Sequence, residues 1–169
     1  MKKVIALVLA MVMAVSMVAC SSKTADKAPL EGTMEENVMK VMEIAPVEFM
    51  GGAIPVDLAD SDSVFYFTGL SSAENITDVS VYEPMMGSQA FSLVMVRTAE
   101  GADPKAVAEE MKAGIDPRKW ICVGADEIMA AGYSDTVMFI MVDSQLGLSA
   151  QSYVDAFAQI AGAELDFTI

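Results

Sequence analysis

Thr136-Val137-Met138-Phe139-Ile140-Met141-Val142 is the stretch of this 169-residue chain that most constrains its fold. Successive side chains of a strand point to opposite faces of a sheet, and this run is apolar on both faces. Strands of that kind lie in the interior of a sheet rather than at its edge. The run therefore predicts a central strand at 136–142.

Two hairpins are predicted around apolar runs of this kind. Residues 121–131 precede the central strand and are joined to it by Gly132-Tyr133-Ser134-Asp135, which has the composition of a turn. Earlier in the chain, residues 78–81 alternate in polarity, and 83–88 supply turn chemistry before the apolar run Phe91-Ser92-Leu93-Val94-Met95-Val96. The sequence thus predicts about four strands in two hairpins.

Three helices are predicted, each from a start signal followed by apolar residues at helical spacing. Thr33-Met34-Glu35-Glu36 has the form of a capping box and begins a helix over about 34–44. Asp103 begins a second helix over about 104–113, and Ser149 begins the third. Helices interspersed with hairpins predict an α+β domain, in which the helices pack mainly on one face of a small antiparallel sheet.

The segment 46–72 has no clear periodicity. It contains Gly51-Gly52, Pro55, three aspartates and the aromatic run Val64-Phe65-Tyr66-Phe67. This composition is typical of irregular chain. We expect one short element within it, lying over the core.

The N-terminus has the architecture of a bacterial lipoprotein export signal. Lys2 and Lys3 precede an apolar stretch from Val4, and Ala19 places a small residue directly before Cys20. The stretch is shorter than the roughly 20 residues that span a bilayer, which argues against an uncleaved anchor. We therefore expect 1–19 to be a signal peptide and Cys20 to be the lipidated first residue of the mature chain.

Residues 20–32 are expected to form a flexible tether, because they are small, polar and contain proline. The remaining residues, 33–169, suit one domain with a single core. The expected location is the outer side of the cell membrane, where the protein is held by the lipid on Cys20 and faces away from the cytoplasm. The type of envelope stays open.

Composition excludes several classes of function. The chain has 24 acidic and 10 basic residues, a formal net charge of −14, which argues against binding nucleic acid. It contains no histidine, so serine or cysteine nucleophiles paired with a histidine base and zinc sites built on imidazole are excluded. No cofactor is indicated, and only carboxylate chemistry remains open to an enzyme.

Cys122 is the only cysteine left once Cys20 is acylated, so an intramolecular disulfide is not expected. It lies in the apolar context Trp120-Ile121-Cys122-Val123. That context predicts a buried, inert thiol rather than a nucleophile.

The order and spacing of Asp78-Val79-Ser80-Val81-Tyr82, of the run 90–96 and of 132–140 resemble the bacterial lipoprotein family catalogued as domain of unknown function 4358. Many members of that family share a lipoprotein signal like the one ending at Cys20. The resemblance implies an extracytoplasmic location and an architecture of this kind. It transfers no site residue, since the family has no established activity, and the segment 46–72 has no counterpart that can be aligned.

Four features of the sequence are candidates for binding or catalytic sites. Asp57, Asp60 and Asp62 could offer oxygen ligands to calcium, but their spacing does not fit an EF-hand, and a solvated loop is the better interpretation. Most methionines lie in apolar strands or helices and are expected to fill the core, whereas Met85-Met86 in a turn would suit a partner-binding tip. Glu109 and Glu110, like Glu35 and Glu36, are expected to face solvent.

The aromatic run was the fourth feature. Phe65, Tyr66 and Phe67, with Gly69, could line a ligand groove or could pin a long loop onto the sheet, and the second interpretation is favoured. No catalytic, metal or ligand-binding residue is assigned.

The leading hypothesis is a non-enzymatic lipoprotein that binds an unidentified protein or envelope component beside the membrane. The alternative is a small-molecule or solute-binding accessory domain, which would need a closed apolar pocket, most plausibly under 46–72. A carboxylate-dependent hydrolase is the third hypothesis, and it would need two acids converging in a cleft.

Overall fold

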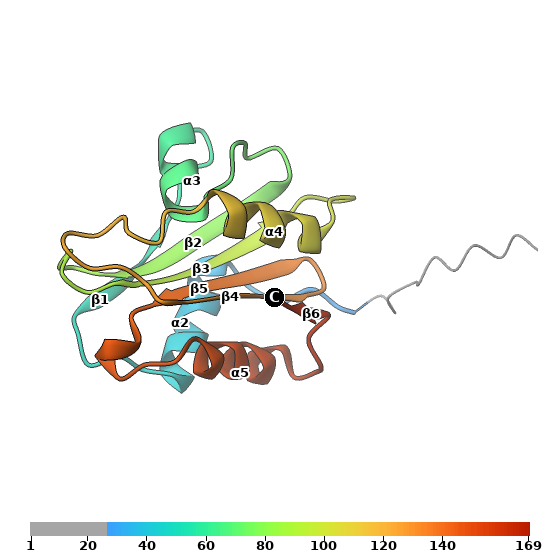
Figure 1. Cartoon of the computed structure of the whole chain (residues 1–169). Helices are drawn as coiled ribbons and strands as arrows, with labels where there is room; N and C mark the ends of the chain where they lie inside the picture. The colour runs from blue at the N-terminus through green and yellow to red at the C-terminus, as the bar shows by residue number, and fades with distance from the viewer. Residues whose placement is uncertain (1–26) are drawn as a thin grey trace, which may run out of the picture.

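A computed structural model describes residues 27–169 as one antiparallel sheet of six strands between two layers of helices (Figure 1). The strands are β1 (Gly51–Pro55), β2 (Ile76–Pro84), β3 (Phe91–Thr98), β4 (Glu127–Tyr133), β5 (Thr136–Val142) and β6 (Phe167–Thr168). The α-helices are α2 (Met34–Ile44), α3 (Ser61–Thr68), α4 (Pro104–Gly114) and α5 (Ala150–Ala161), and a 3-10 turn, η1, covers Ser144–Leu146.

Across the sheet the strands lie in the order β1-β2-β3-β5-β4-β6. The two expected hairpins are β2–β3 and β4–β5, and β3 pairs with β5 in the middle, so the expectation of a central strand at 136–142 is confirmed. The expected number of about four strands is too low. The missed strands are the two edges: β1 is short and begins with two glycines, and β6 has only two residues, so neither carries a usable alternation of apolar and polar residues.

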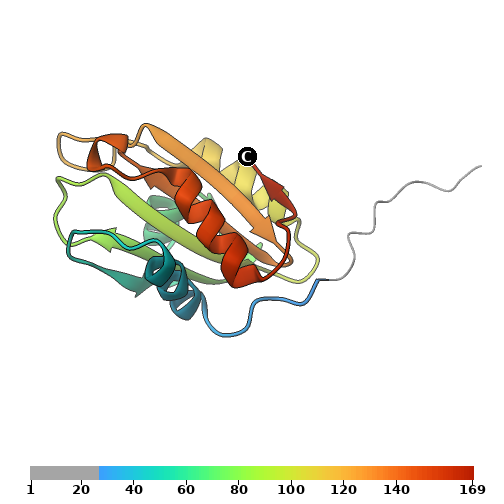
Figure 2. The same cartoon turned by 90° about the horizontal axis from the view of Figure 1, so that it is seen from below.

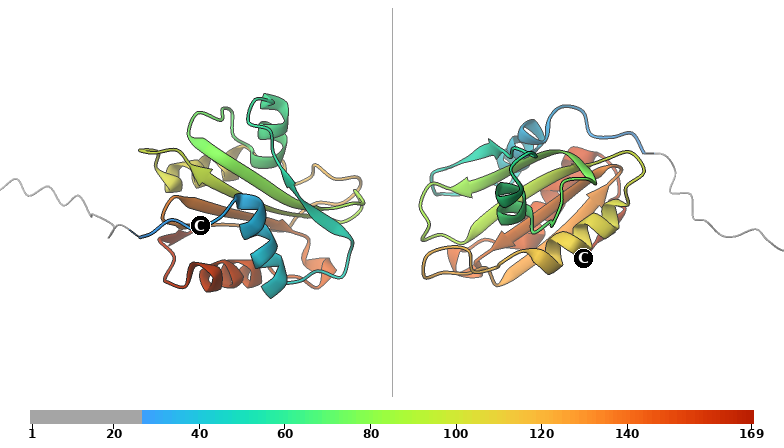
Figure 3. Two further views of the ribbon diagram at one scale, coloured as in Figure 1. Left: turned by 180° about the vertical axis from the view of Figure 1, so that it is seen from behind. Right: turned by 90° about the horizontal axis from the view of Figure 1, so that it is seen from above.

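The expectation that helices pack mainly on one face is wrong. Figures 2 and 3 show α2 and α5 across one face of the sheet and α3 and α4 across the other. Alternate residues of β5 join separate cores: Ile140 packs with α2 and α5, whereas Phe139 packs with α3 and α4. Both faces of the central strands are apolar because both are covered.

The predicted helix starts are confirmed. At α2, the Glu36 N–H donates to Thr33 Oγ1 at 3.2 Å and the Thr33 N–H donates to Glu36 Oε2 at 3.1 Å, which is the reciprocal capping box. Asp103 and Ser149 accept hydrogen bonds from the first turns of α4 and α5. The segment 46–72 is more regular than expected, because it holds both β1 and α3, the latter capped by Asp60.

The strand predicted over 121–131 is wrong at its start. Residues 116–126 form a loop, and β4 begins only at Glu127. Cys122, expected to be buried, is exposed in this loop with a φ of 63°. The left-handed backbone there interrupts the alternation that a strand needs, and it turns the thiol outward.

Residues 27–32, the described part of the expected tether, lie against the domain. Lys27 Nζ pairs with Asp166 Oδ1 at 2.7 Å, and the Lys27 carbonyl accepts from Ser134 Oγ at 2.8 Å. The Leu30 carbonyl accepts from Arg97 Nη2 at 2.6 Å, and the Leu30 side chain packs against the α2–α5 core. The expected signal peptide, Cys20 and the first part of the tether lie outside the described residues.

These contacts distinguish the two ends of the sheet. Ser134 belongs to the turn between β4 and β5, so Lys27 lies at that end, which we call the proximal end. The turn between β2 and β3, residues 85–90, lies at the opposite or distal end, together with the starts of β1 and β4. In Figure 1 the N-terminal segment leaves at the proximal end, on the right.

Candidate binding surface at the distal end of the sheet

The most exposed large apolar side chains of residues 27–169 gather at the distal end. They are Met50, Met85, Met86 and Ile121, which are exposed by 77%, 75%, 65% and 74%. No other large apolar side chain in the described chain exceeds 54%. A methionine or isoleucine exposed to this degree is common singly, but four at one end form a patch of the kind that marks contact sites. We call these four residues the distal patch.

Backbone hydrogen bonds hold the three segments of the distal patch together. The Met85 N–H donates to the Met50 carbonyl at 3.0 Å, which extends the pairing of β1 with β2 by one step. The Ile121 N–H donates to the Gly87 carbonyl at 2.9 Å, which ties the loop 116–126 to the β2–β3 turn. The distal patch is therefore a fixed arrangement of three loops rather than a set of separate side chains.

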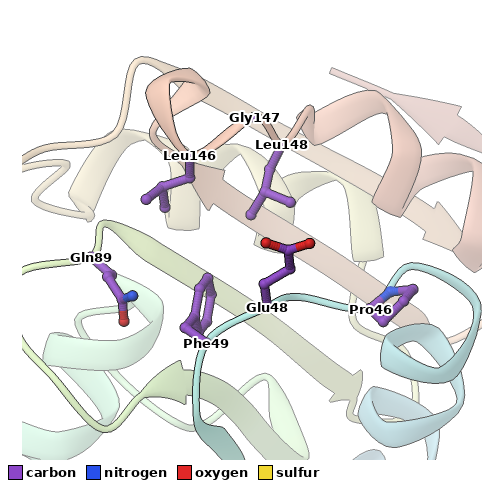
Figure 4. A pocket seen from close by; sticks show the side chains of 7 residues that line it. All are labelled: Pro46, Glu48, Phe49, Gln89, Leu146, Gly147 and Leu148. Carbon is purple, nitrogen blue, oxygen red and sulfur yellow. The ribbon is translucent and has the colours of Figure 1, made fainter.

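A pocket of about 600 Å³ opens beside the distal patch. It is formed where the loop before β1 faces the loop after η1, and its lining residues are Pro46, Glu48, Phe49, Gln89, Leu146, Gly147 and Leu148. Figure 4 shows Leu146 and Leu148 on one side and Phe49 on the other, with the Glu48 carboxylate pointing between them. Four apolar side chains and two polar ones give the composition of a ligand pocket.

Phe49 is the fixed wall of this pocket. Its ring packs edge-on against Phe91 with centroids 5.4 Å apart, and Phe91 packs in turn against Tyr153 of α5 at 5.2 Å. Phe91 is fully buried, so the aromatic row anchors the loop before β1 to the core. Glu48, next to it, takes part in none of the ion pairs found among residues 27–169.

On the α3–α4 face of the distal end, Lys119 is buried beside Glu83. Lys119 Nζ lies 2.6 Å from Glu83 Oε1, and their side chains are only 3% and 13% exposed. The same ammonium lies 4.7 Å from the ring centroid of Tyr66, 5.3 Å from that of Phe67 and 5.4 Å from that of Trp120. One carboxylate and three aromatic rings therefore surround a single ammonium group.

Burial is the main influence on this lysine. Removal from water lowers the pKa of Lys119 below its ordinary value of 10.5, and the nearby carboxylates of Glu83 and Asp116 oppose that shift. Burial also raises the pKa of Tyr66 above 10.0, with Glu83 and Asp116 adding to it. Tyr66, Lys119 and the two carboxylates thus form one electrostatic group.

A second pocket, of about 450 Å³, lies over this group. Asp62, Phe65, Tyr66, Gly114, Asp116 and Lys119 line it. Phe65 and Tyr66 are 54% and 46% exposed, whereas Phe67 packs against the core on the α3–α4 side. Both interpretations of the aromatic run, a ligand groove and a loop pinned onto the sheet, therefore apply in part. Phe65 and Tyr66 line a pocket, and Phe67 pins the segment onto the sheet.

The aspartates of 57–62 serve local structure. Asp57 Oδ1 accepts from the Ala59 N–H at 2.9 Å, and Asp60 accepts from Asp62 N–H, Ser63 N–H and Ser63 Oγ at the start of α3. Within residues 27–169 no three acidic or thiol groups come together in a way that would hold a metal ion. The solvated-loop interpretation agrees with this geometry.

The remaining expectations are mostly confirmed. Met95, Met111, Met138 and Met141 are fully buried and fill the two cores. Met85 and Met86 are exposed in their turn, as expected. Of the glutamates expected to face solvent, Glu110 is the one with a distant partner, since it accepts from both the N–H and the hydroxyl of Ser71.

The pairing of Lys119 with Glu83 was not foreseen. The two residues are 36 positions apart, and neither belongs to a recognisable motif. The one available signal is Lys119 itself, a cation directly before the apolar run Trp120-Ile121-Cys122-Val123. The sequence does not predict the pocket beside Phe49 either, because that pocket is formed by two loops that meet only in the folded chain.

Among residues 27–169 no helix is long and apolar enough to cross a bilayer. The resemblance to domain of unknown function 4358 stays a prediction. Compared with known proteins, the chain matches no family model, no curated protein and no solved structure.

Proposed function

We propose that this protein is a lipid-anchored extracytoplasmic binding module, without enzymatic activity, that contacts a protein or another envelope component through its distal patch. The anchor is the lipid expected on Cys20, whose signal has the charged start, apolar core and small residue before the cysteine that lipoprotein export requires. The observation that carries the binding function is the gathering of Met50, Met85, Met86 and Ile121 at one end of the domain.

The position of the distal patch supports this function. Lys27 lies at the proximal end, and the seven backbone steps from Cys20 to Lys27 span at most about 25 Å. The strands between the two ends contribute about 24 Å, the length of the seven-residue strand β5. A domain attached in this way presents its distal patch on the side farther from its attachment, where a neighbouring protein can reach it.

The chemistry of the distal patch also favours a protein partner. Methionine side chains are flexible and polarisable, and they adapt to apolar surfaces of different shapes. The patch is joined to a rigid sheet by the bonds at Met50 and Gly87, so little backbone order has to be created on binding. The net charge of −14 argues against nucleic acid and against anionic headgroups as the partner.

The test is crosslinking of the full lipoprotein in its native membrane, with adducts identified by mass spectrometry. A Cys20→Ala form serves as the unanchored control. We expect a protein adduct that forms only with the anchored chain and that is lost in the double variant Met85→Ser/Met86→Ser. Met39→Ser is the matched control, because Met39 is a methionine that is 42% exposed on α2 and does not belong to the distal patch.

An adduct that persists unchanged in the Met85→Ser/Met86→Ser variant would contradict the role of the distal patch. An adduct that also forms with the Cys20→Ala chain would contradict the role of the anchor. Loss of the adduct in the Met39→Ser control as well would mean that any loss of exposed methionine lowers crosslinking, and the patch would again lose its support.

A small-molecule or solute-binding function is the second candidate, and the pocket beside Phe49 favours it. Its volume of about 600 Å³ lies within the range of ligand pockets, and Leu146, Leu148 and Phe49 give it apolar walls. The pocket is lined partly by the segment 46–72, as this alternative required, although it is open at the surface rather than closed. A ligand screen by thermal shift, repeated on Leu148→Ser, tests it.

A further inference from the structure

We propose that the second pocket, lined by Asp62, Phe65, Tyr66 and Asp116 over Lys119, binds an organic cation: an ammonium or guanidinium group on a small body. This inference does not depend on the distal patch or on the lipid anchor. It rests on the walls of the pocket, on its excess of carboxylates and on the ammonium group that one of its rings, Tyr66, already contacts.

The walls are aromatic and accessible. Phe65 and Tyr66 come from consecutive positions of α3, both line the pocket, and about half of each residue is exposed to solvent. Aromatic faces attract cations through the negative charge of their π-electrons, and the attraction is largest where water is partly excluded. A volume of about 450 Å³ accommodates a small quaternary ammonium or the end of an arginine side chain.

The carboxylates set the sign of the charge that the pocket accepts. Asp62 and Asp116 take part in none of the ion pairs found among residues 27–169, although both line the pocket. The one cation at the pocket, Lys119, is matched by Glu83 at 2.6 Å. Asp116 also attracts Lys119, so three carboxylates, those of Glu83, Asp62 and Asp116, stand against one ammonium group. This excess of negative charge favours a cation over an anion in the pocket.

Lys119 shows that the Tyr66 ring accepts an ammonium group. Its Nζ lies 4.7 Å from the Tyr66 centroid, and it also donates to the Tyr66 carbonyl at 3.4 Å. This lysine is fixed below the pocket, since its side chain is only 3% exposed. The rest of the pocket is open to solvent, and Asp62 and Asp116 line it with negative charge.

Trp120 allows binding to be measured directly. It is the only tryptophan of the chain, and its ring centroid lies 5.4 Å from Lys119 Nζ. Its indole Nε1 is buried and has no hydrogen-bond partner among residues 27–169. A change of charge at the pocket should therefore alter the tryptophan emission of the full chain.

The experiment titrates the full-length protein with tetramethylammonium chloride and follows Trp120 emission, against sodium chloride at equal ionic strength and against neutral tert-butanol. We expect a saturable change with tetramethylammonium alone. The double variant Asp62→Asn/Asp116→Asn should weaken binding by about tenfold or more. Tyr66→Leu should weaken it by about fivefold. Glu43→Gln, an exposed carboxylate on α2, is the control and should bind normally.

A second arm distinguishes the source of the cation. Acetyl-Ala-Arg-Ala-amide presents the same chemistry on a peptide, and tighter saturation by this peptide than by tetramethylammonium would identify a basic side chain of a protein as the ligand. The reverse order would identify a small free molecule that carries a quaternary ammonium group. Circular dichroism spectra must show that each variant keeps its fold.

Two results would overturn the proposal: an emission change no larger than that given by sodium chloride with both probes, or equal affinity in the wild type and the Asp62→Asn/Asp116→Asn variant. Neither result depends on crosslinking at Met85 and Met86. The failure of this inference and the failure of the proposed function are therefore separable.

Discussion

Breaking the buried pair of Lys119 and Glu83 is expected to destabilise the protein more than any exposed substitution of a charged residue. The perturbation is Lys119→Met, which keeps the length and apolar stem of the side chain and removes only its charge. Glu83 would then remain 13% exposed at the end of β2 without its partner at 2.6 Å. An uncompensated buried charge typically costs about 3–5 kcal/mol.

Two effects in the structure act on this cost in opposite directions. Lys119 makes contacts with three aromatic rings as well as with Glu83, and cation–π contacts add about 0.5–2 kcal/mol in sites of differing exposure. Burial opposes the charged state, as the lowered pKa of Lys119 shows. The double variant Lys119→Met/Glu83→Met removes both charges, so we expect it to regain most of the loss and to lie within about 1.5 kcal/mol of the wild type.

The assay is urea unfolding followed by far-ultraviolet circular dichroism, because Trp120 emission would itself respond to Lys119. The four proteins of the double-mutant cycle give the coupling free energy between the two residues. A coupling of about 2 kcal/mol or more is expected. Additive losses, or a single-variant cost below about 1 kcal/mol, would refute the description of this pair as a desolvated ion pair and would place it with solvent-screened surface pairs.

Three further outcomes are expected. Gly69→Ala should cost about 3 kcal/mol or more by urea unfolding, because Gly69 has a φ of 75° and an added Cβ would lie 2.4 Å from the Ile115 nitrogen. Gly101→Ala, at a φ of 83° with nothing within 4 Å, should cost only about 1 kcal/mol, and equal costs would refute the steric argument. Hydrogen bonds from Ser144 hold the pKa of Asp126 below 3.8, so the stability they give is complete above pH 3.8 and is lost as the pH falls through the lower folded pKa. The melting temperature of Asp126→Asn should therefore lie below that of the wild type at pH 7, with a gap that narrows at acid pH; a constant gap would contradict this. Cys122 should react with a thiol reagent in the native protein nearly as fast as in urea, and protection in the native state would contradict its exposure.

The elements that could be predicted are those with a local signal. The capping box at Thr33, the Asp103 cap and the apolar run of β5 are each decided by a few neighbouring residues, and the structure has them where the sequence indicates. The edge strand β1 was missed because glycines carry no periodicity, and its strand state comes from pairing with β2. Edge strands of this kind are set by tertiary contacts, which propensity alone does not report.

The second layer of helices follows from the apolar residues on both faces of β5. A strand that is apolar on both faces must be buried on both faces. Phe139 and Ile140, which point to opposite faces of β5, lie in separate cores. At the candidate sites, Met85 and Met86 could be singled out because a turn exposes its side chains. Lys119 could not be assigned a partner, since an ion pair between distant strands and loops leaves no spacing in the sequence.

The contacts of residues 27–32 have a mechanical consequence. Arg97 and Asp166 bind residues 27–32 at the proximal end. A partner bound to the distal patch would exert a force on the opposite end of the domain. A load applied between these points runs along the strands, and the bonds between antiparallel strands lie perpendicular to it. Many bonds of the β3–β5 ladder would then share the tension in shear instead of opening one after another. A pull between the two ends would therefore meet the resistance of a whole ladder rather than that of single bonds.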